Sequence, residues 1–171
     1  IDNKSMANRP DLWSHYGIAR ELAALYHLPM KEFPRFDRNV ANTAGFHVTV
    51  EDAERCPRMT GTQIENVCVK PAPYWMQVRI WKTGMRPINA LVDITNYVML
   101  ATGQPSHAYD SDHIAGHIIV RRAKAGETLT LLNGKELPLS TDDLTIADDA
   151  GIVGLAGVMG GAKDSILPTT S

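Results

Sequence analysis

The stretch Asn89–Asp110, NALVDITNYVMLATGQPSHAYD, decides how the rest of the chain is interpreted. Asn89 is of a residue type that caps helices, and the apolar positions after it predict a helix that runs to about Thr102. Gly103 is placed to end this helix, because glycine readily adopts the left-handed conformation found after a last helical turn.

Three polar residues stand out near the end of this expected helix. Thr95 and Asn96 lie in its later part, and His107 follows eleven positions after Asn96 in a Gly-Gln-Pro-Ser-His turn. Pro105 in that turn should present the histidine rigidly. An uncharged cluster of hydrogen-bonding groups of this kind can hold a water molecule and a polar ligand.

Two further helices are expected earlier in the chain. Asn8 or Asp11 can cap the first one, and its apolar stripe ends before Pro29. The stripe consists of Leu12, Ile18, Ala19, Leu22 and Leu25. The second helix opens at Pro71-Ala-Pro73 and should end at Gly84.

Strand patterns occur in two regions. In the first, residues 46–50 alternate apolar with polar side chains, and Gln63–Val69 is a further candidate. In the second, the expected strands are Ile118–Val120, Thr128–Leu132, Leu144–Ala147 and Ile152–Leu155. Asn133-Gly134 is a strong hairpin signal, and Ala156–Gly161 forms a glycine-rich turn.

These patterns predict a mixed α+β fold with a strand-rich core, barrel-like or sandwich, and flanking helices. A length of 171 residues suits a single domain over 1–171, helix-rich up to about 107 and strand-rich from about 108. Because the chain begins with Ile1 and stops within an unfinished pattern, we expect a piece of a longer protein.

Composition sets further limits. The net charge is −2 with both signs scattered along the chain, so no long basic run marks a general nucleic-acid surface. An RNA partner would therefore be bound mainly elsewhere. Cys56 and Cys68 are expected to be reduced, buried thiols rather than a disulfide. No signal peptide and no apolar run long enough to span a bilayer is recognisable.

The motifs resemble those of one enzyme family in order and spacing. The matching blocks are Asn8–Asp11, Gly17–Ala24, Cys56–Arg58, Pro71–Trp75, Gly84–Asn89, Val92–Val98, Gly103–Asp110, Gly126-Glu127, Asn133-Gly134 and Ala156–Gly161. On these blocks the chain resembles the bacterial phenylalanyl-tRNA synthetase beta subunit, in the domain called B3/B4. It departs from the family pattern at Ala101, Tyr109 and Asn133, positions that the resemblance does not link to chemistry.

The resemblance implies an editing domain, excised from a longer beta subunit of phenylalanine–tRNA ligase, that hydrolyses mischarged Tyr-tRNA(Phe). A synthetic pocket excludes an added hydroxyl only modestly, roughly 100-fold, so a second site is needed. The implied partners are tRNA(Phe) and the alpha subunit of the parent heterotetramer, in the cytoplasm and without a membrane. No cofactor is expected in this domain, because ATP and magnesium would bind elsewhere in the synthetase.

The resemblance also implies roles for individual residues. His107 would help to place the hydrolytic water or the terminal ribose, and Thr95 and Asn96 would be wall residues that bond substrate and water. Deacylation needs a positioned water more than a strong base, so neutral groups can suffice. The alternatives are that His107 ties its loop to backbone carbonyls and that Thr95 and Asn96 form a polar helix face.

The substrate ring would be bound by Pro105, Ala156 and Gly157, the last two as small floor residues of the pocket. Alternatively, the glycines only supply unusual backbone angles in a turn. The family places a glutamate that recognises the tyrosine hydroxyl a few residues past Ser171. The fragment alone is therefore expected to be weak or inactive.

Other chemistry is disfavoured. His113 and His117 would face a metal together only on a helix, and the strand expected after them argues against one. Ser106 and Asp110 flank His107 too closely in sequence for a convincing catalytic triad. The alternative function is a non-catalytic RNA-docking or structural scaffold module of the same subunit.

Overall fold

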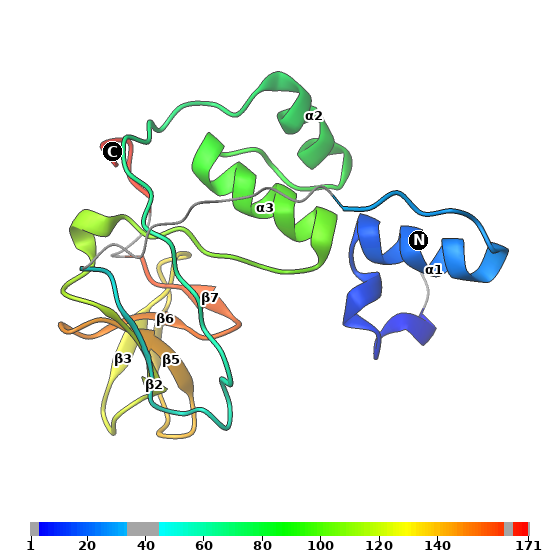
Figure 1. Ribbon diagram of the computed structural model, residues 1–171. Coiled ribbons are helices and arrows are strands. Elements are labelled where there is room, and N and C mark those ends of the chain that lie inside the picture. The colour runs from blue at the N-terminus through cyan, green and yellow to red at the C-terminus, as the bar shows by residue number, and fades with distance from the viewer. Residues whose placement is uncertain (1–3, 34–44, 163–165, 171) are drawn as a thin grey trace. The chain divides into compact units, whose positions relative to one another are not determined.

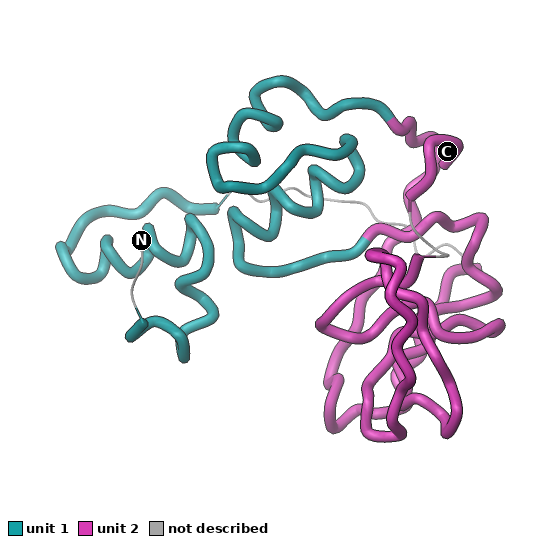
Figure 2. Tube along the Cα trace, turned by 180° about the vertical axis from the view of Figure 1, so that it is seen from behind, with its two compact units in different colours: residues 1–41, 70–107 teal, residues 42–69, 108–171 magenta. Residues whose placement is uncertain are grey.

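The computed structural model describes residues 4–33, 45–162 and 166–170 (Figure 1). The chain divides into two compact units. Unit 1 comprises residues 1–41 and 70–107, and unit 2 comprises residues 42–69 and 108–171 (Figure 2). The segment 42–69 therefore packs with the strand-rich part, although it lies within the first, helix-rich part of the sequence.

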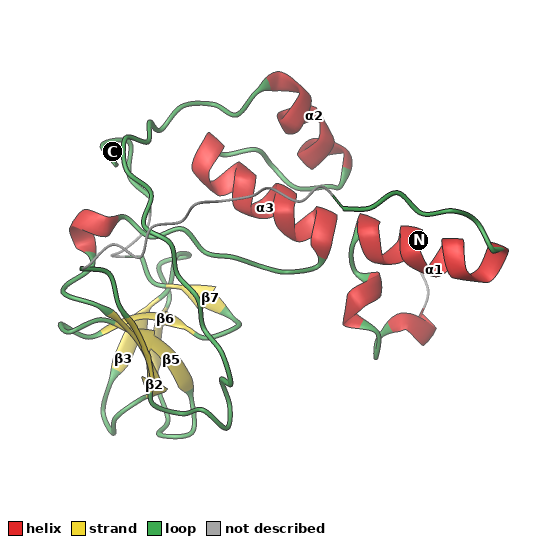
Figure 3. Cartoon of the chain, in the orientation of Figure 1, coloured by secondary structure: helices red, strands yellow, loops and turns green. Residues whose placement is uncertain are grey.

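Helices form the regular structure of unit 1, as Figure 3 shows in red. Two 3-10 helices, Lys4–Met6 (η1) and Pro10–Leu12 (η2), precede α1, which spans His15–Tyr26. The other two helices in the described part of this unit are α2, Tyr74–Lys82, and α3, Ala90–Thr102.

The start of α1 corrects the sequence prediction. The N-cap is Ser14, whose hydroxyl accepts a hydrogen bond of 2.9 Å from the Gly17 N–H, and neither Asn8 nor Asp11 caps the helix. Asp11 is engaged otherwise, because Arg9 donates two hydrogen bonds of 2.9 Å to its carboxylate. The chain around it forms η2 instead.

The predicted ends of α3 are confirmed. The Asn89 side chain accepts hydrogen bonds of 3.1 Å from the N–H groups of Leu91 and Val92, and Gly103 follows the helix with φ of 80°. Asp93 is 1% exposed and fixes the approach to the helix by accepting a 2.8 Å hydrogen bond from the Ile88 N–H. Helices α2 and α3 pack together (Figure 1) around Ala72, Met76, Ile80 and Ala90.

Unit 2 is built on a sheet with the strand order β1-β2-β5-β6-β7 and a separate β3-β4 hairpin within the described residues. The strands are β1 Val48–Val50, β2 Ile118–Arg122, β3 Thr128–Thr130, β4 Glu136–Pro138, β5 Leu144–Ala147, β6 Ile152–Leu155 and β7 Met159–Gly160. The pair β1–β2 is parallel, and the other pairs are antiparallel. A 3-10 helix, Ser111–His113 (η3), precedes the β2 strand.

The core of unit 2 has two parts. Ile118, Val120, Ile146 and Val153 form one cluster on the sheet. The hairpin contributes to a second cluster, formed by Ala123, Leu129, Leu131 and Leu139. This architecture confirms the mixed α+β class, and the Asn133-Gly134 hairpin joins β3 to β4 as predicted.

Two sequence predictions in unit 2 are wrong. Residues 63–69 form no strand, because most of them are exposed and Asn66 takes a left-handed φ of 59°, which interrupts an extended run. The two cysteines are free thiols, but Cys68 is exposed and Cys56 only half-buried, so neither is buried as expected.

Candidate functional site

Thr95 and Asn96 are neighbours on α3 and both are half-buried. The Thr95 hydroxyl donates a 2.7 Å hydrogen bond to the Val92 carbonyl, which leaves its oxygen able to accept. Within the part of the chain that the structure describes, the Asn96 carboxamide has no hydrogen-bond partner. Asn96 is therefore the group in this pair that is available to a ligand through both its donor and its acceptor.

His107 is the last residue of unit 1 and is exposed, as is Pro105. The turn before it is anchored by hydrogen bonds from the Gly103 N–H to the Met99 carbonyl (2.7 Å) and from the Gln104 N–H to the Thr102 hydroxyl (3.1 Å). Solvent reaches the ring, yet the protein atoms around it lower the imidazole pKa by desolvation. The ring is therefore neutral at pH 7, with one nitrogen to donate and one to accept.

Ala156 and Gly157 lie in unit 2, in the tight turn between β6 and β7. The turn is closed by the pairing of Leu155 with Met159, and Gly157 has φ of 71°, which a residue with a side chain rarely adopts. Ala156 is half-buried against the sheet cluster, whereas Gly157 is exposed.

The expected site residues are thus divided between the units. Thr95, Asn96, Pro105 and His107 belong to unit 1, whereas Ala156 and Gly157 belong to unit 2. The prediction that all of them line one concave site stays a prediction.

Asp110 is a structural anchor that the sequence patterns did not single out. It is 3% exposed, and its carboxylate accepts hydrogen bonds from the Thr170 hydroxyl (2.6 Å) and the Asp112 N–H (3.1 Å). The Thr170 bond is the main reason that the Asp110 pKa is lowered, so this carboxylate is ionised at pH 7. A contact sixty positions apart between two common residue types leaves no signal in sequence spacing.

His113 and His117, which were considered as metal ligands, lie beside different carboxylates. His113 Nδ1 lies 3.4 Å from Asp110, and His117 Nδ1 lies 2.9 Å from Asp149. Among the residues that the structure describes, no group of three or more His, Cys, Asp or Glu side chains could hold a metal ion.

Two open grooves lie away from the expected site residues. One, of about 430 Å³, is in unit 2 and is lined by Gly45, His47, Thr49, Gly116 and His117. The other, of about 560 Å³, is in unit 1 between α1 and the segment 28–33 that follows it. Neither includes a residue that the sequence assigned to the site.

Comparisons with known proteins place the chain in a family. The model of the B3/4 domain matches residues 55–171, which include parts of both units. The chain is 45% identical over 172 residues to the phenylalanine–tRNA ligase beta subunit of Solibacter usitatus (strain Ellin6076), which covers the whole chain and 22% of that protein. It is 47% identical over 151 residues to the beta subunit of Streptomyces avermitilis, which covers 88% of the chain and 18% of that protein.

The chain thus spans about a fifth of the length of these curated relatives, and the resemblance seen in its motifs is confirmed. Among solved structures, an N-terminal fragment of the phenylalanyl-tRNA synthetase beta-subunit from Pyrococcus horikoshii aligns with a TM-score of 0.48 and 18% identity. That alignment covers 99% of this chain and 52% of the fragment. No helix within the described ranges is long and apolar enough to cross a membrane.

Proposed function

Because this chain belongs to the B3/4 domain family, we propose that it is the editing domain of a phenylalanine–tRNA ligase beta subunit and hydrolyses Tyr-tRNA(Phe). Its partners would then be tRNA(Phe) and the ligase alpha subunit, in the cytoplasm. ATP and magnesium would bind to other parts of the ligase.

The reaction is attack of a water molecule on the ester carbonyl between tyrosine and the terminal ribose. The ester C–O bond breaks, tyrosine leaves as the acid, and the ribose oxygen takes the proton. Asn96 and Thr95 would hold the water and the substrate, since the carboxamide is unpartnered and the threonine oxygen can accept. Orientation of the water by neutral groups supplies much of the rate for an ester that is already activated.

His107 would act as a neutral imidazole. Its lowered pKa keeps one ring nitrogen unprotonated at pH 7, which can accept a hydrogen bond from the water or from a ribose hydroxyl. In the other unit, Ala156 and Gly157 would leave room for the tyrosine ring.

The observation that carries the proposal is the Asn96 carboxamide, half-buried and without a hydrogen-bond partner among the described residues. Because Asn96 is only half-buried, its carboxamide can exchange hydrogen bonds with water for hydrogen bonds with a ligand. A free amide beside Thr95, in a family motif, supports a role in ligand binding.

The test is deacylation of Tyr-tRNA(Phe) by a ligase that carries this chain. We expect Asn96→Ala with His107→Ala to lower hydrolysis by at least about 100-fold, the scale of losing oriented hydrogen-bonding groups, and to leave aminoacylation unchanged. The matched control is Asn8→Ala with His47→Ala, two exposed residues of the same types. Equal hydrolysis by the wild type and the double variant would overturn the proposed roles.

A second variant tests the floor of the pocket. Ala156→Trp should block editing and spare aminoacylation, because a large ring would fill the space expected for tyrosine. Ala125→Trp, at an exposed alanine in the turn after β2, is the control for adding a tryptophan. Unchanged hydrolysis in Ala156→Trp would remove Ala156 from the site.

A further inference from the structure

The two units carry opposite charge. Unit 1 has ten Lys and Arg against six Asp and Glu, a net charge of +4, whereas unit 2 has seven against thirteen, a net charge of −6. The overall value of −2 conceals this division. Much of the positive charge lies in one stretch, since Lys70, Arg79, Lys82 and Arg86 are all exposed and no Asp or Glu occurs between Glu65 and Asp93.

Helix α2, in the middle of this stretch, also exposes aromatic rings. Tyr74 is 81% exposed and Trp81 is 70% exposed. Seven residues apart, they lie on nearly the same line along the helix, about 10 Å from each other along its axis. Both rings are therefore largely exposed to solvent in a stretch that carries Lys and Arg but no Asp or Glu. Exposed rings of this kind can stack on planar ligands such as nucleic-acid bases.

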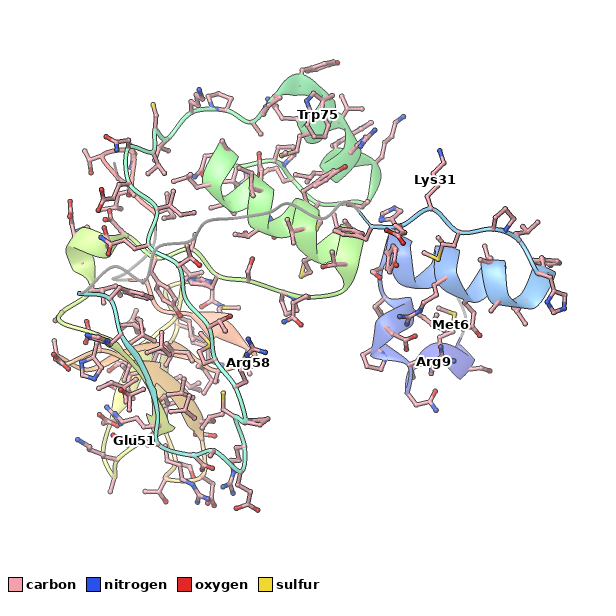
Figure 4. The ribbon with its side chains drawn as sticks, in the orientation of Figure 1. Met6, Arg9, Lys31, Glu51, Arg58 and Trp75 are labelled. Atoms are coloured by element: carbon pink, nitrogen blue, oxygen red, sulfur yellow. The ribbon has the colours of Figure 1, made fainter. Side chains whose placement is uncertain are left out.

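A third ring of the helix, Trp75, is labelled in Figure 4 and lies about 100° around α2 from Tyr74. The Arg79 guanidinium lies over the Trp75 ring, 5.2 Å from its centroid, and donates a 2.6 Å hydrogen bond to the Tyr97 hydroxyl. Tyr97 in turn contacts the edge of Trp75, with ring centroids 5.6 Å apart. These contacts hold the exposed Arg79 cation against Trp75 and Tyr97, on a different side of α2 from Tyr74 and Trp81.

We propose that the exposed rings Tyr74 and Trp81 of α2, with Lys82 at the end of the helix and Arg86 in the loop after it as phosphate contacts, bind single-stranded RNA. Aromatic rings next to cations are the combination that single-stranded nucleic acids recognise, since bases stack on the rings and phosphates meet the cations. The local excess of positive charge favours a polyanion over an apolar protein surface. The inference deepens the proposed function, on which it rests for the identity of the strand as the unpaired end of tRNA.

The test measures binding of the 171-residue chain to a fluorescein-labelled RNA strand of about ten nucleotides by fluorescence anisotropy. Tyr74→Ala with Trp81→Ala should raise Kd by about 100-fold, roughly tenfold for each stacking ring. Because both rings are largely exposed, the variant should fold normally. The control is Trp13→Ala with Tyr26→Ala, a matching pair in the same unit that is 69% and 68% exposed.

The cations are tested separately, which also covers any folding defect of the aromatic variant. Lys82→Gln with Arg86→Gln should make the slope of log affinity against log salt shallower by about 1.4, the value for two lost phosphate contacts on a single strand. Lys4→Gln with Lys31→Gln, exposed lysines outside the stretch, should leave the slope unchanged. RNA affinity and salt slope that are unaltered in both α2 variants would overturn the inference.

The outcomes separate this inference from the proposed editing function. If the wild-type ligase fails to hydrolyse Tyr-tRNA(Phe) but the α2 variants lose RNA affinity, the editing proposal fails and the RNA surface stands. If hydrolysis occurs and the aromatic variant raises its KM with kcat unchanged, both stand. If the α2 variants lose binding to the alpha subunit and keep RNA affinity, α2 is a protein-docking surface and the inference is wrong.

Discussion

Unit 2 buries more apolar side chains than it exposes, whereas unit 1 exposes more large apolar side chains than it buries. In the described part of unit 2 the sheet and hairpin bury nine apolar side chains, and five large apolar side chains remain exposed. In unit 1 the corresponding numbers are five buried and twelve exposed. The strand unit is therefore held by its own core, whereas the helical unit has most of its large apolar groups on the surface.

The ion pairs differ in the same way. In unit 2, Arg121 donates hydrogen bonds of 2.9 and 2.8 Å to the two oxygens of Glu127, and the side chains are 9% and 25% exposed. In unit 1, Arg9 and Asp11 form a similar bidentate pair, but the side chains are 44% and 33% exposed. A bidentate ion pair of this kind should stabilise the fold more where water is excluded than where both side chains are exposed.

The largest expected effect comes from breaking the Arg121–Glu127 pair, in which the arginine is buried. Glu127→Gln leaves the buried Arg121 charge without its counter-ion, which typically costs about 3 kcal/mol of unfolding free energy. Replacement of both partners, Arg121→Met with Glu127→Leu, should restore most of the loss, since an apolar pair needs no counter-ion. Hydrogen exchange in peptides from β2 and β5, followed by mass spectrometry, measures the stability of unit 2 directly.

The exposed pair is the control for that experiment. Asp11→Asn should leave the exchange of unit 1 peptides close to wild type, because exposed ion pairs are screened by water and salt. Equal destabilisation of the two units by the two substitutions would show that burial does not separate these ion pairs.

Acid should act on unit 2 through the same pair. The Arg121 hydrogen bonds are the main cause that lowers the Glu127 pKa from 4.5 to about 2. A carboxylate whose folded pKa lies below its unfolded value stabilises the fold above about pH 4.5, and this contribution is lost as pH falls toward 2. The stability of unit 2 should fall across that window, and Glu127→Gln should flatten the fall.

Asp11 in unit 1 is the exposed counterpart of Glu127 in this titration. Hydrogen bonds from Arg9 lower its pKa to about 2 as well, but the group is open to solvent. Water and salt screen an exposed pair, so the lowering of the Asp11 pKa, and with it the stability that this titration contributes to unit 1, should be much smaller than at Glu127. If unit 1 of the wild type lost as much stability as unit 2 when the pH falls, and the Asp11→Asn variant did not, this expectation would be wrong.

Much of the fold is predictable because local signals agree with the final packing. The limits of α3 follow from a capping asparagine and a left-handed glycine, and β5 and β6 span the residues that the sequence patterns predicted. The signals fail where a local preference has competition. Asp11 is a good capping residue type, but its pairing with Arg9 and Arg20 leaves the cap to Ser14.

The site was predictable only in part, for a physical reason. A motif can indicate Thr95 and Asn96 as neighbours on one helix, because their spacing is local. It cannot indicate that Asp110 binds Thr170, or that 42–69 pairs its β1 strand with β2, because those contacts join distant segments. The opposite charges of the units were missed for the same reason, since they appear only once the chain is divided by contacts.

Removal of the N-cap of α3 tests whether the two units unfold separately. Asn89→Ala removes the cap of α3 and should destabilise unit 1 by about 1 kcal/mol, the usual cost of a lost N-cap. All three tryptophans, Trp13, Trp75 and Trp81, belong to unit 1, so the change in tryptophan fluorescence with denaturant follows that unit alone. Hydrogen exchange of β2 and β5 follows unit 2 in the same samples. Because the units differ in core and charge, we expect the fluorescence midpoint to fall and the exchange of unit 2 to stay constant. Thr141→Ala, in the exposed turn before β5, controls for an alanine substitution and should move neither signal. If Asn89→Ala shifts both signals equally, the units unfold as one cooperative body, and the contrast between them would be one of composition alone.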